Sequence, residues 1–239
     1  MGKVLKRAAC AGLVLATAAG LFVGGALWGF REALPTPRQL LTAGAELDLC
    51  VPDPKPAFVP LAEIPLPVRG AFLAVEDSKL MERPAVNPLL QITLVALSGR
   101  RAPTGAMSQS LAHCLLSPWR GNTLAWHAAV AWTDWRLLRD LPRERLLEAY
   151  LNAVYLGRGA YGIGAAAQAY CGKAPKDLNL AEAAMLAGLP KAPAYLAAHP
   201  PLAAARRDHV LDAMVANGFV TADEAAMAKT APSCLPPEG

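Results

Sequence analysis

Residues 146–173 read LLEAYLNAVYLGRGAYGIGAAAQAYCGK, and residues 178–196 read LNLAEAAMLAGLPKAPAYL. In the first stretch, apolar side chains recur at spacings of three and four, which predicts an amphipathic helix over 143–156 that Gly157 ends. The apolar face of this helix consists of Leu146, Leu147, Tyr150, Leu151 and Val154. The periodicity indicates a helical fold around this segment.

Helical signals also occupy the rest of the chain from residue 68 onward. Asn179 followed by Glu182 is typical of a capping box, and Thr221 followed by Glu224 repeats the pattern. Further helices are predicted over 68–75, 108–116, 125–141, 180–188 and 202–217. No segment has a convincing strand period. We therefore predict one all-α domain over 61–230.

The N-terminal segment has the length and composition of a membrane anchor. No residue from Ala8 to Phe30 is charged, and this run is long enough to cross a hydrocarbon core of about 30 Å. A cleaved signal peptide is the alternative, but it has a shorter apolar core and small residues at its cleavage site, where this chain has Trp28. Aromatic residues at that position suit a membrane interface. Residues 1–33 are therefore predicted to be a cytoplasmic tip and one transmembrane helix.

Charge and proline content predict what surrounds this anchor. The cations ahead of it are Lys3, Lys6 and Arg7. They predict a cytoplasmic N-terminus and an extracytoplasmic, periplasmic domain held at the inner membrane. Residues 34–60 are rich in proline and are predicted to form an extended stalk, and residues 231–239 a loose tail.

The exported part is expected to be nearly neutral and oxidised. The whole chain carries a net charge of +4, and three cations precede the span. No basic stripe with interleaved aromatic residues occurs, which excludes nucleic acid as a partner. The cysteines outside the span are Cys50, Cys114, Cys171 and Cys234. They permit up to two disulfides, whose pairing the sequence leaves open, and their spacing does not predict a structural metal site.

The stretch over 146–196 resembles the peptidoglycan glycosyltransferases of family 51, which polymerise a lipid-linked disaccharide into glycan strands. That family's Tyr-Leu-Asn, Gly-x-Gly-x-Tyr-Gly-Ile, alanine run, aromatic-x-Gly-Lys and Ala-Glu-Ala with a later Leu-Pro are met nearly in full. AFLAVED at 71–77 is similar to the family's first motif, and GAMSQSLAHCLL at 105–116 to its second. An ordered series over 60–227 is specific. The resemblance implies an α-helical, lysozyme-like fold.

The resemblance also implies a catalytic base. The family's reaction needs a base for the 4-hydroxyl of the acceptor sugar, a positive group for the departing pyrophosphate, and a groove near the membrane. The glutamate of the first motif maps onto Glu76, and its neighbour Asp77 is expected to contact substrate. Glu76 follows an apolar run, one turn past Phe72, so partial burial is expected to raise its pKa. A solvated carboxylate at a helix end is the alternative.

The second motif departs from the family pattern. Ser108 and Gln109 match or nearly match it and are expected to contact substrate. The family's second glutamine is replaced by Ser110, its lysine by His113 and its asparagine by Cys114. The lost lysine removes a fixed cation that could meet a diphosphate, and a histidine is largely neutral near pH 7. His113 remains a candidate substrate-binding residue.

The third motif departs further. The family's Arg-Lys pair falls on Trp126 and His127, and its second glutamate falls on Val130. That glutamate is thought to act at the leaving pyrophosphate through a divalent cation such as Mg²⁺, and the sequence leaves open whether this chain needs one. Asp134 lies one helical turn away and is a candidate replacement. A surface acid is the alternative reading of Asp134, and the catalytic reading predicts that Asp134→Asn abolishes activity.

The remaining candidate substrate-binding residues are Asn152, Tyr155 and Lys173, which belong to retained motifs. For Tyr155 a place in the core is the alternative, and for Lys173 a role at a helix end. Glu148 and Glu182 match family glutamates, but their helical settings favour structural hydrogen bonds.

Three functions fit these observations. The favoured one is a monofunctional peptidoglycan glycosyltransferase that extends glycan strands from a lipid-linked precursor at the membrane. The second is a non-catalytic relative that binds lipid-linked sugar or another envelope protein, which the altered second and third motifs favour. The third is a lysozyme-like enzyme that cleaves glycan with a single acid.

Overall fold

The fold is organised around one short buried helix, α9 (Leu180–Gly188), in which every residue from Ala181 to Gly188 is buried. The computed structural model describes residues 17–18, 20–21, 24–25, 51–52, 56–88, 105–117 and 124–234. Four helices pack against α9: α3 (Leu66–Glu76), α8 (Gly162–Cys171), α11 (Pro200–Ala216) and α12 (Ala222–Thr230). The alanines of α9 and its one glycine, Gly188, allow this close packing. A Cβ atom at Gly188 would lie only 2.8 Å from Cγ of Arg206 on α11.

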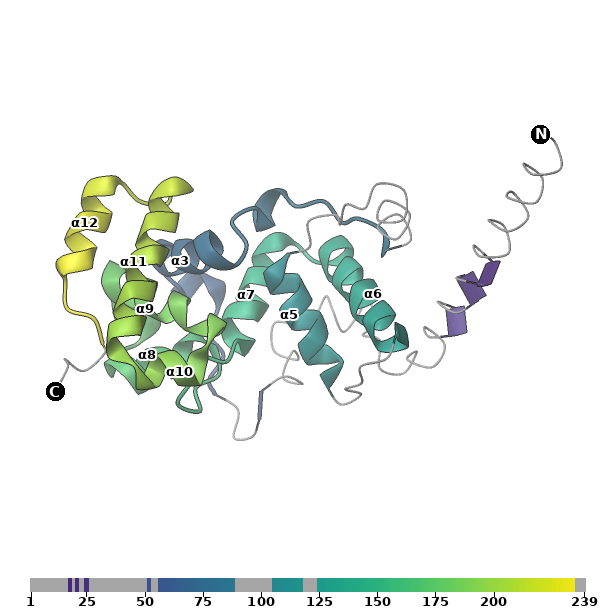
Figure 1. The fold of residues 1–239 in the computed structure, drawn as a ribbon, viewed down its shortest axis with the longest axis horizontal. Helices are drawn as coiled ribbons and strands as arrows, with labels where there is room; N and C mark the ends of the chain where they lie inside the picture. The colour runs from purple at the N-terminus through teal and green to yellow at the C-terminus, as the bar shows by residue number, and fades with distance from the viewer. Residues whose placement is uncertain are drawn as a thin grey trace.

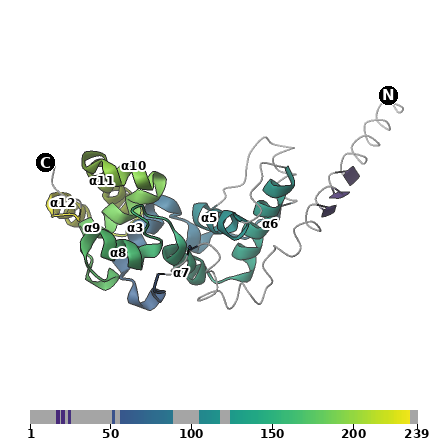
Figure 2. The same cartoon turned by 90° about the horizontal axis from the view of Figure 1, so that it is seen from below.

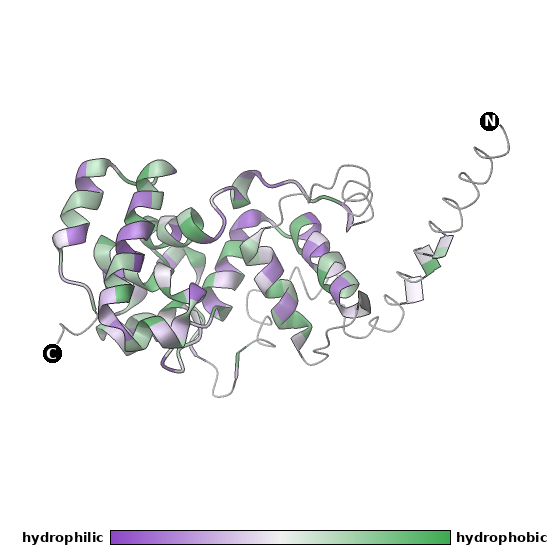
Figure 3. Cartoon of the chain, viewed as in Figure 1, coloured by the Kyte–Doolittle hydropathy of each residue, from purple (hydrophilic) through white to green (hydrophobic). Residues whose placement is uncertain are grey.

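A second group of helices lies beside the first. It consists of α5 (Ala106–Leu115), α6 (Leu124–Asp140) and α7 (Arg143–Ala153), and α5 packs against both of the others. In Figures 1 and 2, α8 to α12 gather toward the C-terminal end of the domain and α6 lies at the opposite end. The helix α7 also packs against α8, so it joins the two groups. Hydrophobic and hydrophilic residues are interspersed along α5 and α6, as Figure 3 shows.

Short elements complete the domain. They are α10 (Pro193–Ala198) and the 3-10 helices Leu61–Glu63, Leu80–Glu82, Pro175–Asp177 and Leu189–Lys191. Across the described residues, the only β-type pairing is an isolated bridge between Tyr155 and Tyr161. The predicted all-α class is therefore confirmed for this part of the chain.

The predicted helices are present with modest shifts at their ends. Both capping boxes form, with Asn179 accepting a hydrogen bond from the Glu182 amide and Thr221 one from the Glu224 amide. The helix predicted over 143–156 ends early, at Ala153, because the chain turns into an extended conformation at Val154. The helices α8 and α10 were not among the predicted elements.

A tight loop explains the early end of α7. Gly157 and Gly162 both have positive φ values, of 88° and 76°. The amide of Gly162 donates a 2.8 Å hydrogen bond to the Val154 carbonyl, which closes the loop. A Cβ atom at Gly162 would lie 2.5 Å from the Asn152 carbonyl oxygen, so only glycine fits this return of the chain.

The predicted membrane span and most of the predicted stalk lie outside the described residues. Of the span, only residues 17–18, 20–21 and 24–25 are described, and they are helical. Among the described helices, none has the length and apolar character needed to cross a membrane.

A disulfide holds the tail of the domain in place. Cys171 at the end of α8 is bonded to Cys234, with Cα atoms 4.9 Å apart and a sequence separation of 63. Cys114 is disulfide-bonded as well. The sequence left the pairing open, and the structure selects Cys171 with Cys234 because the end of α12 returns to the end of α8.

The double variant Cys171→Ser/Cys234→Ser is expected to lose about 4 kcal/mol of unfolding free energy, because the bond closes a long loop in the unfolded chain. Urea unfolding of the detergent-solubilised chain, followed by circular dichroism, measures the difference. Wild type and variant compared under reducing conditions, where every disulfide is open, are the control and should have nearly equal midpoints. Equal midpoints for variant and oxidised wild type would contradict this role.

Candidate active site

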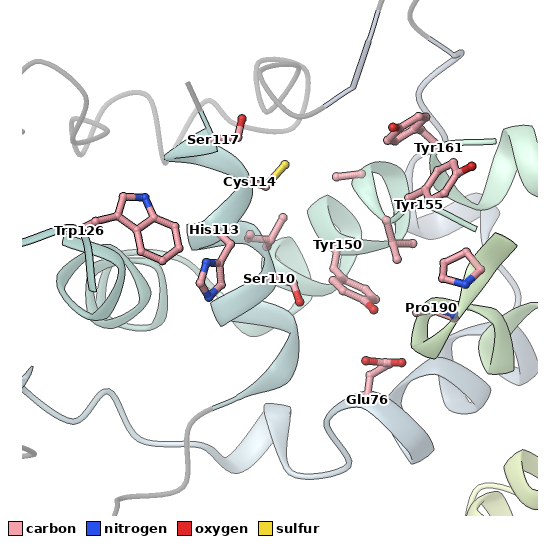
Figure 4. A pocket seen from close by; sticks show the side chains of 14 residues that line it. Glu76, Ser110, His113, Cys114, Ser117, Trp126, Tyr150, Tyr155, Tyr161 and Pro190 are labelled. Carbon is pink, nitrogen blue, oxygen red and sulfur yellow. The ribbon is translucent and has the colours of Figure 1, made fainter. Parts of the chain in front are cut away.

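A cavity of about 1010 Å³ opens between the two helix groups. Its walls come from the end of α3, one face of α5, the first turn of α6 and the end of α7. The loop after α7, the 3-10 helix Leu189–Lys191 and the start of α10 complete them. The lining residues are Glu76, Ser110, Leu111, His113, Cys114, Ser117, Trp126, Tyr150, Ala153, Val154, Tyr155, Tyr161, Pro190 and Pro193. Figure 4 shows Glu76 on one side of this pocket and the pair His113 and Trp126 on the other.

Glu76 is the one acidic side chain among the described residues that line the pocket. It is the last residue of α3. Burial raises its pKa above the ordinary value, while a hydrogen bond from Tyr150 and the positive charge of Arg206 act in the opposite direction. The expected partial burial of Glu76 is thus confirmed. A carboxylate with a raised pKa that opens into a cavity has the properties of a general base.

Tyr150 positions this carboxylate. The Tyr150 side chain is 3% exposed, and its ring meets Phe72 edge to face at a centroid distance of 6.4 Å. Phe72 is on α3, one turn before Glu76, so the two aromatic rings fix α7 against the end of α3. Figure 4 shows the Tyr150 hydroxyl pointing toward the Glu76 carboxylate.

Tyr150→Phe is expected to raise the pKa of Glu76 further, because it removes a hydrogen bond that stabilises the ionised carboxylate. A carbon-13 NMR titration of the Glu76 carboxyl in the full-length chain measures the shift. Tyr195→Phe, at an exposed tyrosine outside the pocket lining, is the matched control. A Glu76 titration unchanged by Tyr150→Phe would show that the two groups do not interact.

The wall formed by α5 and the residues just after it carries uncharged polar side chains and one imidazole. Ser110, His113, Cys114 and Ser117 line the pocket at helical spacings of three and four. The His113 ring lies against Trp126 at a centroid distance of 5.0 Å and an interplanar angle of 44°, and Trp126 meets His127 edge to face at 5.1 Å. The described lining contains neither lysine nor arginine.

Two tyrosines form the wall near the glycine-rich loop. Tyr155 and Tyr161 are joined by the isolated bridge, and their rings lie 4.8 Å apart. Tyr155 is 37% exposed, so the core position considered for it is not what the structure shows. Exposed tyrosine rings beside a cavity offer apolar faces together with hydroxyl groups, which suits contact with a sugar.

Several of the expected site residues lie in a buried polar cluster outside the pocket lining. Asp77 forms an ion pair with Arg83. Asp134 on α6 is 4% exposed and interacts with the Ser108 hydroxyl and with the charge of Arg83. The guanidinium of Arg143 donates a 2.7 Å hydrogen bond to the Arg83 carbonyl. The structure therefore brings Asp77, Ser108 and Asp134 together, but it does not bring Asp134 into the pocket with Glu76.

Asp134→Asn is accordingly expected to preserve function and to change the pH dependence of stability. Burial raises the pKa of Asp134 above its ordinary value of 3.8, so the stability supplied by the protonated form is complete below that value. It is lost as the pH rises through the folded-state pKa. The variant does not titrate, so its unfolding free energy should rise relative to wild type across this window. Urea unfolding at a series of pH values measures the difference, and parallel curves would contradict the assignment.

Two other expected substrate contacts are engaged in structural hydrogen bonds. The Asn152 side chain accepts a 2.8 Å hydrogen bond from the Val59 amide and donates to the Val59 carbonyl, and so holds the segment at 56–60 against α7. Lys173 forms a 2.7 Å ion pair with Glu182 of the capping box. Gln109 is exposed on α5 and is not among the lining residues.

The described pocket offers few protein ligands for a divalent cation. Proteins usually bind Mg²⁺ through one or two carboxylates together with water and substrate phosphates, and the described lining offers one carboxylate, on the candidate base itself. Val130, at the position of the family's second glutamate, is 4% exposed and lies in the hydrophobic core. Elsewhere in the described chain, Cys171, Glu182 and Cys234 come within ligand distance of one another, but both sulfur atoms are in the disulfide.

Some lining residues were not predicted to belong to the site. Tyr150 was assigned to an apolar helix face, and Ser110, Cys114 and Trp126 were noted only as departures from motifs. The spacing of residues 110, 113, 114 and 117 was the available signal, since it places them on one face of a helix. Which helix covers that face depends on tertiary packing.

Comparisons with known proteins identify the family. The model of the Transglycosylase family matches residues 46–215. The chain is 39% identical over 198 residues to penicillin-binding protein 1A of Escherichia coli and 36% identical over 177 residues to penicillin-binding protein 1F of Bacillus subtilis. It is 33% identical over 208 residues to a Cupriavidus necator protein provisionally named a transglycosylase. The chain therefore belongs to the Transglycosylase family, as its motifs predicted.

These relatives differ in length. The match covers 79% of this chain but 23% of the Escherichia coli protein, and 84% of this chain with 88% of the Cupriavidus necator protein. A crystal structure of penicillin-binding protein 1A from Haemophilus influenzae is 26% identical, with a TM-score of 0.44, over 74% of this chain and 17% of that one. The chain thus spans about a quarter of the length of its penicillin-binding relatives.

Proposed function

We propose that this protein is a peptidoglycan glycosyltransferase that uses Glu76 as its base. The observation that carries the proposal is the position of Glu76, alone as an acid in the described pocket lining and with a pKa raised by burial. The substrate is a lipid-linked disaccharide-peptide precursor, and the acceptor is the 4-hydroxyl of a sugar. The Glu76 carboxylate takes the hydroxyl proton as the oxygen attacks, and polyisoprenyl diphosphate leaves.

The pocket walls support a sugar substrate. Tyr155 and Tyr161 offer ring faces, and Ser110 and Ser117 offer hydroxyl groups. A site built to bind sugars combines such apolar faces with a few polar groups that fix orientation. The expected substrate contacts in the pocket are therefore His113 and Tyr155, while Asp77, Ser108, Asn152 and Lys173 support the structure around it.

The N-terminal run at residues 8–30 supports a position of this pocket at a membrane. Its length and lack of charge suit a single span, and the preceding cations suit a cytoplasmic N-terminus. The domain then lies on the extracytoplasmic side, where its lipid-linked substrate is anchored in the same bilayer.

A non-catalytic glycan-binding protein is the second candidate. Val130 is buried where the family has its second glutamate, and the described lining carries no lysine or arginine. A pocket with these changes can still bind sugar through its aromatic walls. Glycan cleavage is less well supported, since glycosidases ordinarily place two carboxylates across the scissile bond.

Polymerisation of a fluorescent lipid-linked disaccharide by the detergent-solubilised protein tests these alternatives. Wild type should form glycan ladders, and Glu76→Gln should lower the rate by about 10²- to 10⁴-fold because a positioned base is lost. Glu144→Gln, at an exposed glutamate on α7, is the matched control and should retain the wild-type rate.

The outcomes separate the two candidates. Ladders that persist in Glu76→Gln would refute Glu76 as the base. An absence of ladders from wild type, together with retained binding of the lipid-linked substrate, would leave the glycan-binding function.

A further inference from the structure

We infer that protonated His113 supplies the positive charge for the leaving diphosphate in this pocket. The inference rests on the proposed function and deepens it, because it names the group that replaces the cations missing from the second and third motifs. His113 is the one basic side chain among the described lining residues, and an imidazole gains its positive charge as the pH falls from about 8 to about 5.

The geometry places His113 across the pocket from the base. Figure 4 shows the imidazole on the α5 wall beside Trp126, and Glu76 on the opposite side below Tyr150. Glycosyl transfer needs this separation, since the proton of the attacking hydroxyl and the charge of the leaving group develop on opposite sides of the reacting carbon. The cavity of about 1010 Å³ has the size of a small-molecule binding site.

Two features of the fold attract a positive charge on this ring. His113 lies in the last turn of α5, at the negative end of the helix dipole. Its ring centroid also lies 5.0 Å from that of Trp126, at an interplanar angle of 44°, and a nearby indole ring attracts a cation. The imidazole is exposed, so it also reaches the substrate.

The other titratable groups around the ring come from every neighbouring helix. His127 on α6 lies next to Trp126. Tyr150 on α7 and Glu76 on α3 both line the pocket. Cys114 on α5 does not titrate because it is disulfide-bonded. Asp77, Arg83 and Asp134 belong to the buried cluster outside the lining.

Glu76 and His113 together account for the proton and the charge that move during glycosyl transfer. The acceptor oxygen forms a bond to the anomeric carbon while the bond from that carbon to the phosphate oxygen breaks, and its electron pair stays on the diphosphate. The hydroxyl proton moves to Glu76. The His113 imidazolium keeps its proton and donates a charge-assisted hydrogen bond to the departing oxygen. Turnover then needs Glu76 ionised and His113 protonated, which gives a bell-shaped pH profile.

Binding of a short-chain prenyl diphosphate to the full-length protein tests the inference without requiring turnover. Wild type should bind this probe about tenfold tighter at about pH 5.5 than at about pH 8.5, after correction by His113→Gln for titration of the probe itself. His113→Lys should keep the tight binding at the higher pH, since lysine remains charged there. His199→Gln, at an exposed histidine outside the pocket lining, is the matched control and should behave as wild type. The corresponding prenyl alcohol should bind all four proteins equally.

Polymerisation assays give a second readout. The alkaline limb of the pH profile should disappear in His113→Lys and the maximum rate should fall in His113→Gln. Ladders with an unchanged pH profile and unchanged diphosphate affinity in both variants would overturn the role of His113 and leave the proposed function intact. If wild type makes no ladders, a His113-dependent diphosphate affinity still supports the inference, and a His113-independent one refutes it.

Discussion

The burial of α9 from Ala181 to Gly188 is the constraint on which the rest of this domain depends. A helix covered on nearly all sides needs small side chains where its neighbours come closest, because larger ones would hold those neighbours apart. The alanines of α9 meet this requirement and let α3 and α11 approach closely. With α3 fixed in this way, its last residue, Glu76, is held at the junction with α7, where Tyr150 reaches it. The position of the candidate base is therefore a consequence of core packing.

The charged residues near α5 lie in two places, the pocket and the buried polar cluster outside its lining. The carboxylates other than Glu76 that lie near α5 are buried on its far side, where Asp77 and Asp134 share the charge of Arg83. The pocket side of α5 carries hydroxyl groups, an imidazole and aromatic rings. Buried charges are tolerated only where they are paired, so the cluster contributes to how α3, α5 and α6 fit together. The described lining of the pocket carries a single acid, Glu76.

In the described structure, some residues of the retained motifs do not line the pocket, and some positions that depart from the family pattern do. The retained Asn152 and Lys173 bond to the segment at 56–60 and to the capping box of α9, and they hold the scaffold together. The changed positions, such as His113 and Trp126, lie on the pocket wall. Motif residues that are retained thus lie in the scaffold, whereas positions that depart from the family pattern lie on the described pocket wall.

The sequence by itself determined the helical class, most helix positions, both capping boxes, the family and the partial burial of Glu76. These features follow from local patterns, since apolar periodicity and capping residues act within a few turns of one helix. Only the tertiary structure decided that Asp134 faces the buried cluster, that Cys171 pairs with Cys234, and that Tyr150 and Trp126 line the pocket. A residue at helical spacing can be assigned to a face from sequence, but what covers that face depends on the packing of helices that are distant in the chain. The early end of α7 had a similar cause, because the glycine-rich loop returns against Asn152 and leaves no room for another turn.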